Sequence, residues 1–320
     1  MNEMPKFQII DEESDGVTVS ILCPRTLKEQ VFPKKNEKDS PFTFLEVDPS
    51  IPIIIYFHGG GFVMGGSLDF YSVSMFDKLL STTTTKQGRH RDAIFVSVEY
   101  RLAPERPFPC GLIDCLSVME YVCSCKCSPI TRKFHLAGAS AGGNFCTVVT
   151  MEHLRRFKDH RISSVFIDIP FLDPNANSLS YYKNSKSSIV PFLSWCFRSY
   201  ISSKLTGNDD DDKDFTNNTT HAQESLWMKD DNIARLIYPT KSVPPAKNDA
   251  DVVKFIVVTS LADPLHDDGV ALVNKLEEMG HTELKHFETM SDHATYPFCD
   301  RSMAKKICSS WSSNVFENTV

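Results

Sequence analysis

The chain has 320 residues, of which 41% are apolar and 23% charged, a balance typical of a globular protein with a large core. Its formal net charge of -7 disfavours nucleic acid as a partner, because phosphate binding requires a basic face. No stretch reaches the roughly 18 apolar residues of a membrane-spanning helix, and the N-terminus lacks a signal-peptide pattern, so we expect a cytoplasmic protein with reduced cysteines.

Two local clusters resemble metal sites, but neither has the spacing that a metal requires. Residues 209–212 are four consecutive aspartates followed by Asp214, and this run lacks the glycine and the distal glutamate of a calcium loop. We interpret it as a solvated loop. Cys123, Cys125 and Cys127 form a C-x-C-x-C cluster, whereas zinc sites use C-x-x-C pairs answered by a second pair. The sequence therefore predicts neither a metal nor a cofactor.

Apolar, β-branched runs alternate with helical patterns along most of the chain. An alternating segment at residues 7–22 predicts an antiparallel edge hairpin. We expect further strands at residues 51–57, 93–98, 134–137, 164–169, 255–259 and 284–288. We expect helices at residues 67–81, 109–124, 142–158, 268–279 and 301–311. Near-continuous apolar strands between helices predict an α/β fold, with a mostly parallel, doubly wound sheet covered by helices on both faces.

Residues 172–250 break this rhythm. The segment is rich in Asn, Ser, Asp and Pro, with aromatic residues interspersed, and it lies between two expected strands. Loops over the carboxyl edge of an open α/β sheet are where ligands bind. We therefore predict one domain over residues 1–320 with a cap or lid insertion at about 172–250.

The strongest local motif is Gly138-Ala139-Ser140-Ala141-Gly142, between an expected strand and an expected helix. A serine that projects from the top of a sheet needs a sharp strand-to-helix turn, and the crowded backbone there leaves room only for glycine two residues to either side. This pattern is typical of a nucleophile elbow. The sequence therefore predicts Ser140 as a nucleophile.

A second glycine-rich segment, HGGGF at residues 58–62, follows the expected strand at 51–57. Glycines allow the backbone to approach a substrate oxygen closely, so Gly60 and Gly61 can aim their N–H groups at it. The helix that follows the elbow adds the N–H of Ala141 and the positive end of its dipole. We predict an oxyanion hole from these three groups, with His58 in a structural role.

A serine nucleophile requires a base, and the base requires an orienting carboxylate. Asp263 follows the expected strand at 255–259, and His293 follows the expected strand at 284–288, in the order Ser, Asp, His of this fold type. The rival acids Asp267 and Asp268 resemble helix N-cap residues. The rival histidines, at positions 281 and 286, lie before or within a strand. We therefore predict Asp263 as the orienting acid and His293 as the base.

Four motifs in this order resemble the hormone-sensitive lipase family of esterases and lipases, also called the GDXG family. They are HGGGF, YRLAPERPFP at residues 100–109, GASAGGN and ADPLHDDG at residues 262–269. The resemblance spans residues 51 to about 298 and implies an α/β-hydrolase fold and ester hydrolysis without a cofactor. It implies the same roles for Ser140, Asp263 and His293, and a brace near the site from Arg101 and Glu105.

The sequence departs from the family pattern in four places. The family usually has aspartate where this chain has Ala139, so the chain lacks a supporting carboxylate at this position. Glu99 stands where aspartate is common, and Ala294-Thr295 replaces the usual Gly-Phe after the base. The first expected strand begins near residue 7, so we expect the N-terminal cap helices of many members to be missing and the pocket to be more open.

These residues predict a serine carboxylesterase that hydrolyses short- to medium-chain esters through a Ser140–His293–Asp263 triad and an acyl-enzyme. Two alternatives stay open: an amide hydrolase of the arylacetamide deacetylase or formamidase type, and a small-molecule receptor without catalysis. The expected partner is a small ester, and a homo-oligomer is compatible with the sequence.

Overall fold

The computed structural model describes residues 8–14, 16–24, 27, 31, 47–82, 92–124, 133–157, 161–184, 186–201, 230–246, 252–293, 297 and 300–316. The aspartate run at 209–212 with Asp214, Cys125, Cys127 and the pair Ala294-Thr295 lie outside the described residues. So does part of the interval at 172–250.

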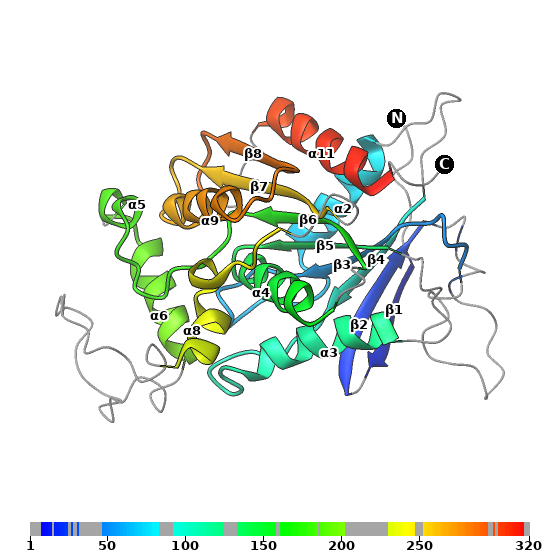
Figure 1. Ribbon diagram of the computed structural model, residues 1–320, viewed down its shortest axis with the longest axis horizontal. Coiled ribbons are helices and arrows are strands. Elements are labelled where there is room, and N and C mark those ends of the chain that lie inside the picture. The colour runs from blue at the N-terminus through cyan, green and yellow to red at the C-terminus, as the bar shows by residue number, and fades with distance from the viewer. Residues whose placement is uncertain are drawn as a thin grey trace.

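The sheet has eight strands in the order β1-β2-β4-β3-β5-β6-β7-β8 (Figure 1). β2 runs antiparallel to both β1 and β4, and the other five strand pairs are parallel, so the edge hairpin and the mostly parallel sheet are confirmed. The strands are β1 (Gln8–Ser14), β2 (Val17–Cys23), β3 (Ile53–Phe57), β4 (Ile94–Val98), β5 (Phe134–Ala139), β6 (Ile162–Asp168), β7 (Lys254–Ser260) and β8 (Leu284–Thr289). Each of the sheet strands expected from residue 51 onward is present, with its ends moved by a few residues.

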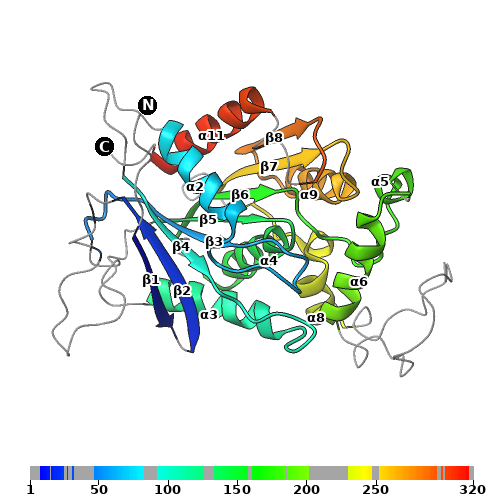
Figure 2. The same ribbon diagram turned by 180° about the vertical axis from the view of Figure 1, so that it is seen from behind.

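Helices cover both faces of this sheet, as predicted (Figures 1 and 2). One face carries α2 (Phe70–Thr82) and α11 (Arg301–Phe316), which pack on each other. The other face carries α3 (Cys110–Ser124), α4 (Ala141–Arg156) and α9 (His266–Glu278).

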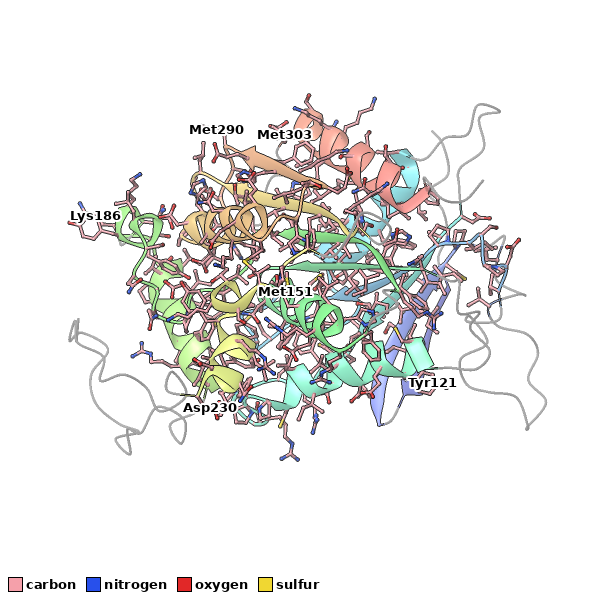
Figure 3. All side chains as sticks on the ribbon, in the orientation of Figure 1. Tyr121, Met151, Lys186, Asp230, Met290 and Met303 are labelled. Carbon is pink, nitrogen blue, oxygen red and sulfur yellow. The ribbon has the colours of Figure 1, made fainter. Side chains whose placement is uncertain are left out.

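The strands feed two apolar cores because successive side chains point to opposite faces. In β3, Ile53, Ile55 and Phe57 join the core under α3, α4 and α9, whereas Ile54 and Tyr56 join the core under α2 and α11. Figure 3 shows side chains filling the space between the sheet and the helices, with Met290 at the periphery. A strand that is apolar at every position is therefore explained by burial on both faces.

The interval between β6 and β7 contains α5 (Leu179–Lys183), α6 (Ile189–Ile201), α8 (Asp231–Ile237) and the 3₁₀ turn η4 (Pro239–Ser242). Two carboxylates at the start of α9 hold the first part of this interval through hydrogen bonds to its backbone. Asp268 Oδ2 accepts the N–H groups of Leu172 and Asp173, both at 2.8 Å, and Asp267 Oδ2 accepts that of Ser180 at 2.8 Å. The expectation that these aspartates are N-cap residues was wrong, because α9 begins at His266 and both lie in its first turn.

An ion pair attaches the end of the same interval to the main domain. Glu152 of α4 is buried, and its Oε1 lies 2.6 Å from Arg155 and 3.1 Å from Arg235 of α8. The interval is therefore joined to the main domain at both of its ends by buried carboxylates.

Within the described ranges, every helix is too short or too polar to cross a bilayer.

Candidate active site

The turn between β5 and α4 has the backbone of a nucleophile elbow. Ser140 has φ 54° and ψ -117°, a left-handed conformation that is uncommon for residues other than glycine. A Cβ at Gly138 would lie 2.2 Å from the Gly142 carbonyl oxygen, and one at Gly142 would lie 1.9 Å from that of Phe57. Both positions therefore require glycine, as the sequence motif predicted.

The HGGGF segment forms a tight loop beside this elbow. Gly60 has φ 115° and Gly61 has φ 62°, and a Cβ at Gly60 would lie 1.9 Å from the Met64 carbonyl oxygen. A Cβ at Gly59 would lie 3.6 Å from the Ser140 Cβ, so the loop adjoins Ser140. Among the described residues, no protein acceptor takes the N–H of Gly60, Gly61 or Ala141. These three donors are therefore free to bind a ligand oxygen.

His58 holds the loop from below. Its ring stacks on Tyr100 at 4.0 Å between centroids, its Nδ1 donates to the Gly59 carbonyl at 2.7 Å, and the Tyr100 phenol donates to the His58 carbonyl at 2.7 Å. Burial lowers the pKa of His58, so the neutral ring is favoured. This geometry supports the structural role expected for His58.

The insertion between β6 and β7 touches this loop directly. Phe62 stacks on Tyr200 of α6 with 4.1 Å between ring centroids. A Cβ at Gly61 would lie only 2.6 Å from Cys196 Sγ, also in α6. Helix α6 is therefore packed directly against the glycine loop.

Asp263 and His293 meet at the carboxyl ends of β7 and β8. Asp263 is fully buried, its Oδ1 accepts the Leu265 N–H at 2.9 Å, and its Oδ2 lies 2.7 Å from His293 Nδ1. Burial lowers the pKa of His293, but the charge and hydrogen bond of Asp263, with a contribution from Asp168, raise that pKa above its usual value. Asp263 therefore stabilises the imidazolium form of His293 relative to a buried ring without this carboxylate.

The elbow and the Asp263–His293 pair stand at one edge of the sheet, since Ser140 follows β5 in the same way that the other two follow β7 and β8. The hydrogen bonds of the described chain join His293 to Asp263 and do not join it to the Ser140 hydroxyl. Hydrogen bonds between a nucleophile and its base often tighten only when substrate binds.

The rival histidines are engaged elsewhere. His281 Nε2 lies 3.0 Å from the Pro244 carbonyl oxygen, and His286 Nε2 lies 2.8 Å from Thr259 Oγ1 within the sheet.

Arg101 forms its ion pair with Asp114, at 2.7 Å, rather than with Glu105. The brace expected from Arg101 and Glu105 thus has a different acid.

Sequence reasoning missed two residues near the site, Asp168 at the end of β6 and Tyr71 in α2. The Tyr71 phenol donates to Asp168 Oδ2, and Asp168 is fully buried. The available signal was an acidic residue inside the apolar run at residues 164–169. Its meaning required the pairing of β6 with β5, which the sequence does not display.

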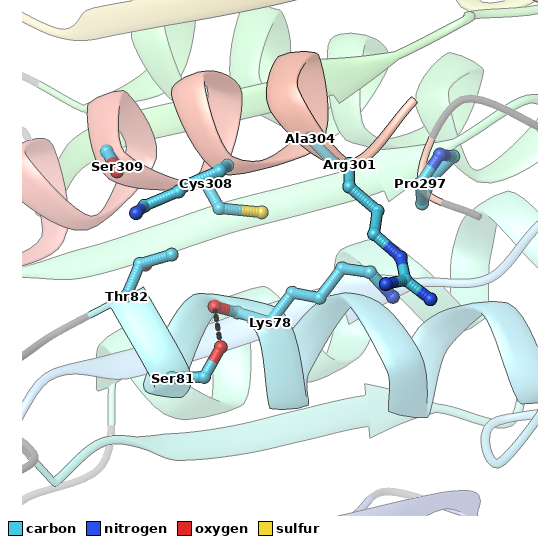
Figure 4. A pocket seen from close by; sticks show the side chains of 9 residues that line it. Lys78, Ser81, Thr82, Pro297, Arg301, Ala304, Cys308 and Ser309 are labelled. Carbon is cyan, nitrogen blue, oxygen red and sulfur yellow. Dashed lines mark hydrogen bonds between the residues drawn. The ribbon is translucent and has the colours of Figure 1, made fainter. Parts of the chain in front are cut away.

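A cavity of about 400 Å³ lies away from this edge, between α2 and α11 (Figure 4). Its lining includes Lys78, Arg301 and Lys305 but none of the predicted site residues. In the part of the chain that the structure describes, no three His, Cys, Asp or Glu side chains gather as metal ligands would.

Comparison with known proteins identifies the family and the fold. The profile of the alpha/beta hydrolase fold family matches residues 54–296. An esterase of Gibberella moniliformis is 25% identical over 238 residues, which make up 73% of this chain and 64% of that protein. Esterase LipI of Mycobacterium tuberculosis is 37% identical over 151 residues, 45% of this chain and 38% of that protein. The chain thus spans less than two thirds of the length of these relatives.

Solved structures share the fold at low sequence identity. A hyperthermophilic esterase from the archaeon Pyrobaculum calidifontis gives a TM-score of 0.63 at 19% identity, over 98% of this chain and 85% of that one. An esterase/lipase from an uncultured bacterium gives 0.64 at 16% identity, over 97% and 85%. The chain therefore belongs to the α/β-hydrolase fold family, and the resemblance of its motifs to the hormone-sensitive lipase (GDXG) type of esterases and lipases is confirmed.

Proposed function

We propose that the protein is a serine carboxylesterase with Ser140 as nucleophile, His293 as base and Asp263 as orienting acid. The observation that carries this proposal is the 2.7 Å contact between His293 Nδ1 and the buried Asp263 carboxylate, at the same sheet edge as the Ser140 elbow. A carboxylate on Nδ1 leaves Nε2 of the neutral ring to accept a proton, which is the tautomer that a base requires. Names of relatives as esterases support the same reaction.

The reaction proceeds by two acyl transfers. His293 Nε2 accepts the Ser140 hydroxyl proton while Oγ attacks the ester carbonyl carbon. The resulting oxyanion receives hydrogen bonds from the free N–H groups of Gly60, Gly61 and Ala141. The C–O bond of the alcohol breaks as His293 returns the proton to the leaving oxygen. Water, deprotonated by His293, then attacks the acyl-enzyme and releases the acid and Ser140.

The contacts of α6 support short- to medium-chain esters as substrates. Cys196 lies close to Gly61 and Tyr200 stacks on Phe62, and we propose that α6 bounds the space that the acyl chain of the substrate occupies. A receptor without catalysis is disfavoured, because such a protein has no need of a buried acid on His293.

We also propose a cytoplasmic location, which the free thiols of the described cysteines support.

Turnover of p-nitrophenyl butyrate by the wild type and by Ser140→Ala tests the proposal. Removing the nucleophile is expected to lower kcat by about 10⁴-fold or more. A fluorophosphonate probe should label the wild type and not the variant. Ser313→Ala removes an exposed hydroxyl on α11 and should retain both properties. Wild-type turnover in Ser140→Ala would contradict the assignment.

A matched pair of substrates addresses the amide alternative. Rates on a butyrate ester and on the corresponding anilide compare the two leaving groups in the same site. The carboxylesterase proposal expects kcat/KM to favour the ester by at least about 10²-fold, since an anilide nitrogen is the poorer leaving group. Equal rates would identify an amide hydrolase instead.

A further inference from the structure

Asp168 is a fully buried carboxylate that the proposed mechanism does not use. It is the last residue of β6, and its side chain is 0% exposed. The register of the sheet pairs it with Ala139, the residue before Ser140. Paired residues of adjacent strands point to the same face, and the strands lie about 4.8 Å apart. Asp168 therefore brings a negative charge beside the elbow, where Ala139 brings none.

Two contacts hold Asp168 against the site. The Tyr71 phenol of α2 donates to its Oδ2, and its main-chain carbonyl accepts the Ser140 N–H at 2.9 Å. Burying an ionised carboxylate costs free energy even when it is hydrogen bonded. A residue whose backbone holds the nucleophile thus also places a costly charge at the same edge of the sheet.

The charge of Asp168 acts on the base. Among the described residues, the acidic groups that raise the pKa of His293 are Asp263, whose Oδ2 lies 2.7 Å from Nδ1, and Asp168, at the end of β6, the strand next to β7. Both favour the protonated ring, against burial, which disfavours it. The imidazolium that forms when Ser140 attacks is therefore balanced by two carboxylates.

We propose that Asp168 is a positioning residue whose buried carboxylate, held by Tyr71, stabilises the imidazolium form of His293 during acyl transfer. The inference rests on the proposed function. The family that the motifs resemble usually has aspartate where this chain has Ala139, and here a carboxylate stands one strand away, on β6. The exchange keeps a buried negative charge on the same face of the sheet while changing the strand that bears it.

Asp168→Asn removes the charge and keeps the size and the Tyr71 hydrogen bond. The proposal expects kcat for p-nitrophenyl butyrate to fall by about 10- to 100-fold with KM within about threefold. The acidic limb of the kcat/KM profile should move to lower pH, because loss of a nearby negative charge disfavours protonated His293. An unchanged kcat and an unchanged limb in folded Asp168→Asn would overturn the proposal.

Asp114→Asn is the matched control for the loss of a buried acid. Asp114 is 3% exposed and pairs with Arg101, away from His293. Its neutralisation should lower Tm without moving the acidic limb. If both variants lower Tm and both leave the limb in place, Asp168 is only a structural tie between β6 and α2.

Returning the charge to β5 tests the proposal independently of Asp168→Asn folding. The double variant Ala139→Asp/Asp168→Ala should be at least about tenfold faster than Asp168→Ala. No recovery in a folded double variant would overturn the proposal. Fluorophosphonate labelling separates the two levels: an unlabelled wild type refutes the serine esterase itself, whereas labelled wild type with unaffected Asp168 variants refutes only the role of Asp168.

Discussion

The sheet edge that carries Ser140 and the insertion between β6 and β7 are held by different interactions. At the edge, main-chain atoms approach so closely that a Cβ at Gly142 or Gly60 would lie 1.9 Å from a carbonyl oxygen. The insertion is attached by side chains instead, through Asp268 to the Leu172 N–H and through Glu152 to Arg235. The first region admits no added atom, whereas the second can adjust its side chains. We therefore expect the proposed chemistry to depend on the edge, and the range of substrates to depend on the insertion.

The largest effect of a single charge should come from Asp263→Asn. Loss of the carboxylate leaves His293 in the wrong tautomer and without its counter-charge, so kcat is expected to fall by about 10⁴-fold. The acidic limb of kcat/KM should also move to lower pH, since Asp263 raises the pKa of His293 against the effect of burial. Asp267→Asn changes a neighbouring acid that binds the Ser180 N–H, and should alter kcat by less than about tenfold.

Gly60→Ala probes the backbone of the edge. The added methyl would meet the Met64 carbonyl oxygen, so the loop must move and an oxyanion donor is lost. We expect kcat to fall by about 10²- to 10³-fold. Gly280→Ala is the control, because Gly280 also has positive φ, of 83°, but its Cβ would meet only Ala246 at 3.8 Å. A similar loss of kcat in both variants would show that general strain, and not the oxyanion donor, is responsible.

Arg235→Gln weakens the attachment of the insertion. It removes one partner of buried Glu152, and the unfolding free energy is expected to fall by about 0.5–1.5 kcal/mol. The variant should change KM for medium-chain p-nitrophenyl esters. It should change kcat for p-nitrophenyl acetate less, because the sheet edge that carries Ser140 stays intact. Arg156→Gln removes a longer, more exposed contact to the same carboxylate, at 3.5 Å, and should change Tm less. Equal changes in the kinetic constants for the acetate and for medium-chain esters would show that the insertion does not select substrates.

The smallest effect concerns the stability of the sheet at acid pH. Burial, with a contribution from Lys254, lowers the pKa of His135 to about 3. The unfolded chain takes up that proton near pH 6.5, so stability should fall as the pH drops below about 6.5. His135→Asn should flatten this dependence in urea unfolding measured between pH 7.5 and 5, provided that Asn keeps the contact to Ser164.

His266→Asn should act in the opposite sense. Burial lowers the pKa of His266, but hydrogen bonds to Glu288 and Asp267 raise it overall, so this side chain stabilises the fold at low pH. Its loss should steepen the decline of stability toward acid. A dependence that is the same in both variants would contradict these assignments.

Local patterns predicted much of the architecture because periodicity and glycine positions report short-range physics. The apolar run before His58 became β3, and the glycines around Ser140 stand where the elbow excludes a side chain. The order of Asp263 and His293 followed from strand ends that share one edge of a parallel sheet. The partner of Arg101 and the roles of Asp267 and Asp268 were not predicted correctly, because they depend on contacts between distant segments.

The fold class, the elbow, the glycine loop and the candidate triad residues could all be predicted from motifs within short segments of the sequence. The contact of Asp263 with His293, the packing of α6 against Gly61 and the pairing of Asp168 with Ala139 became apparent only in the folded chain. Strand register and helix packing bring together residues that no local pattern relates. Electrostatic fields in a buried site depend on that arrangement more than on the identity of any one residue.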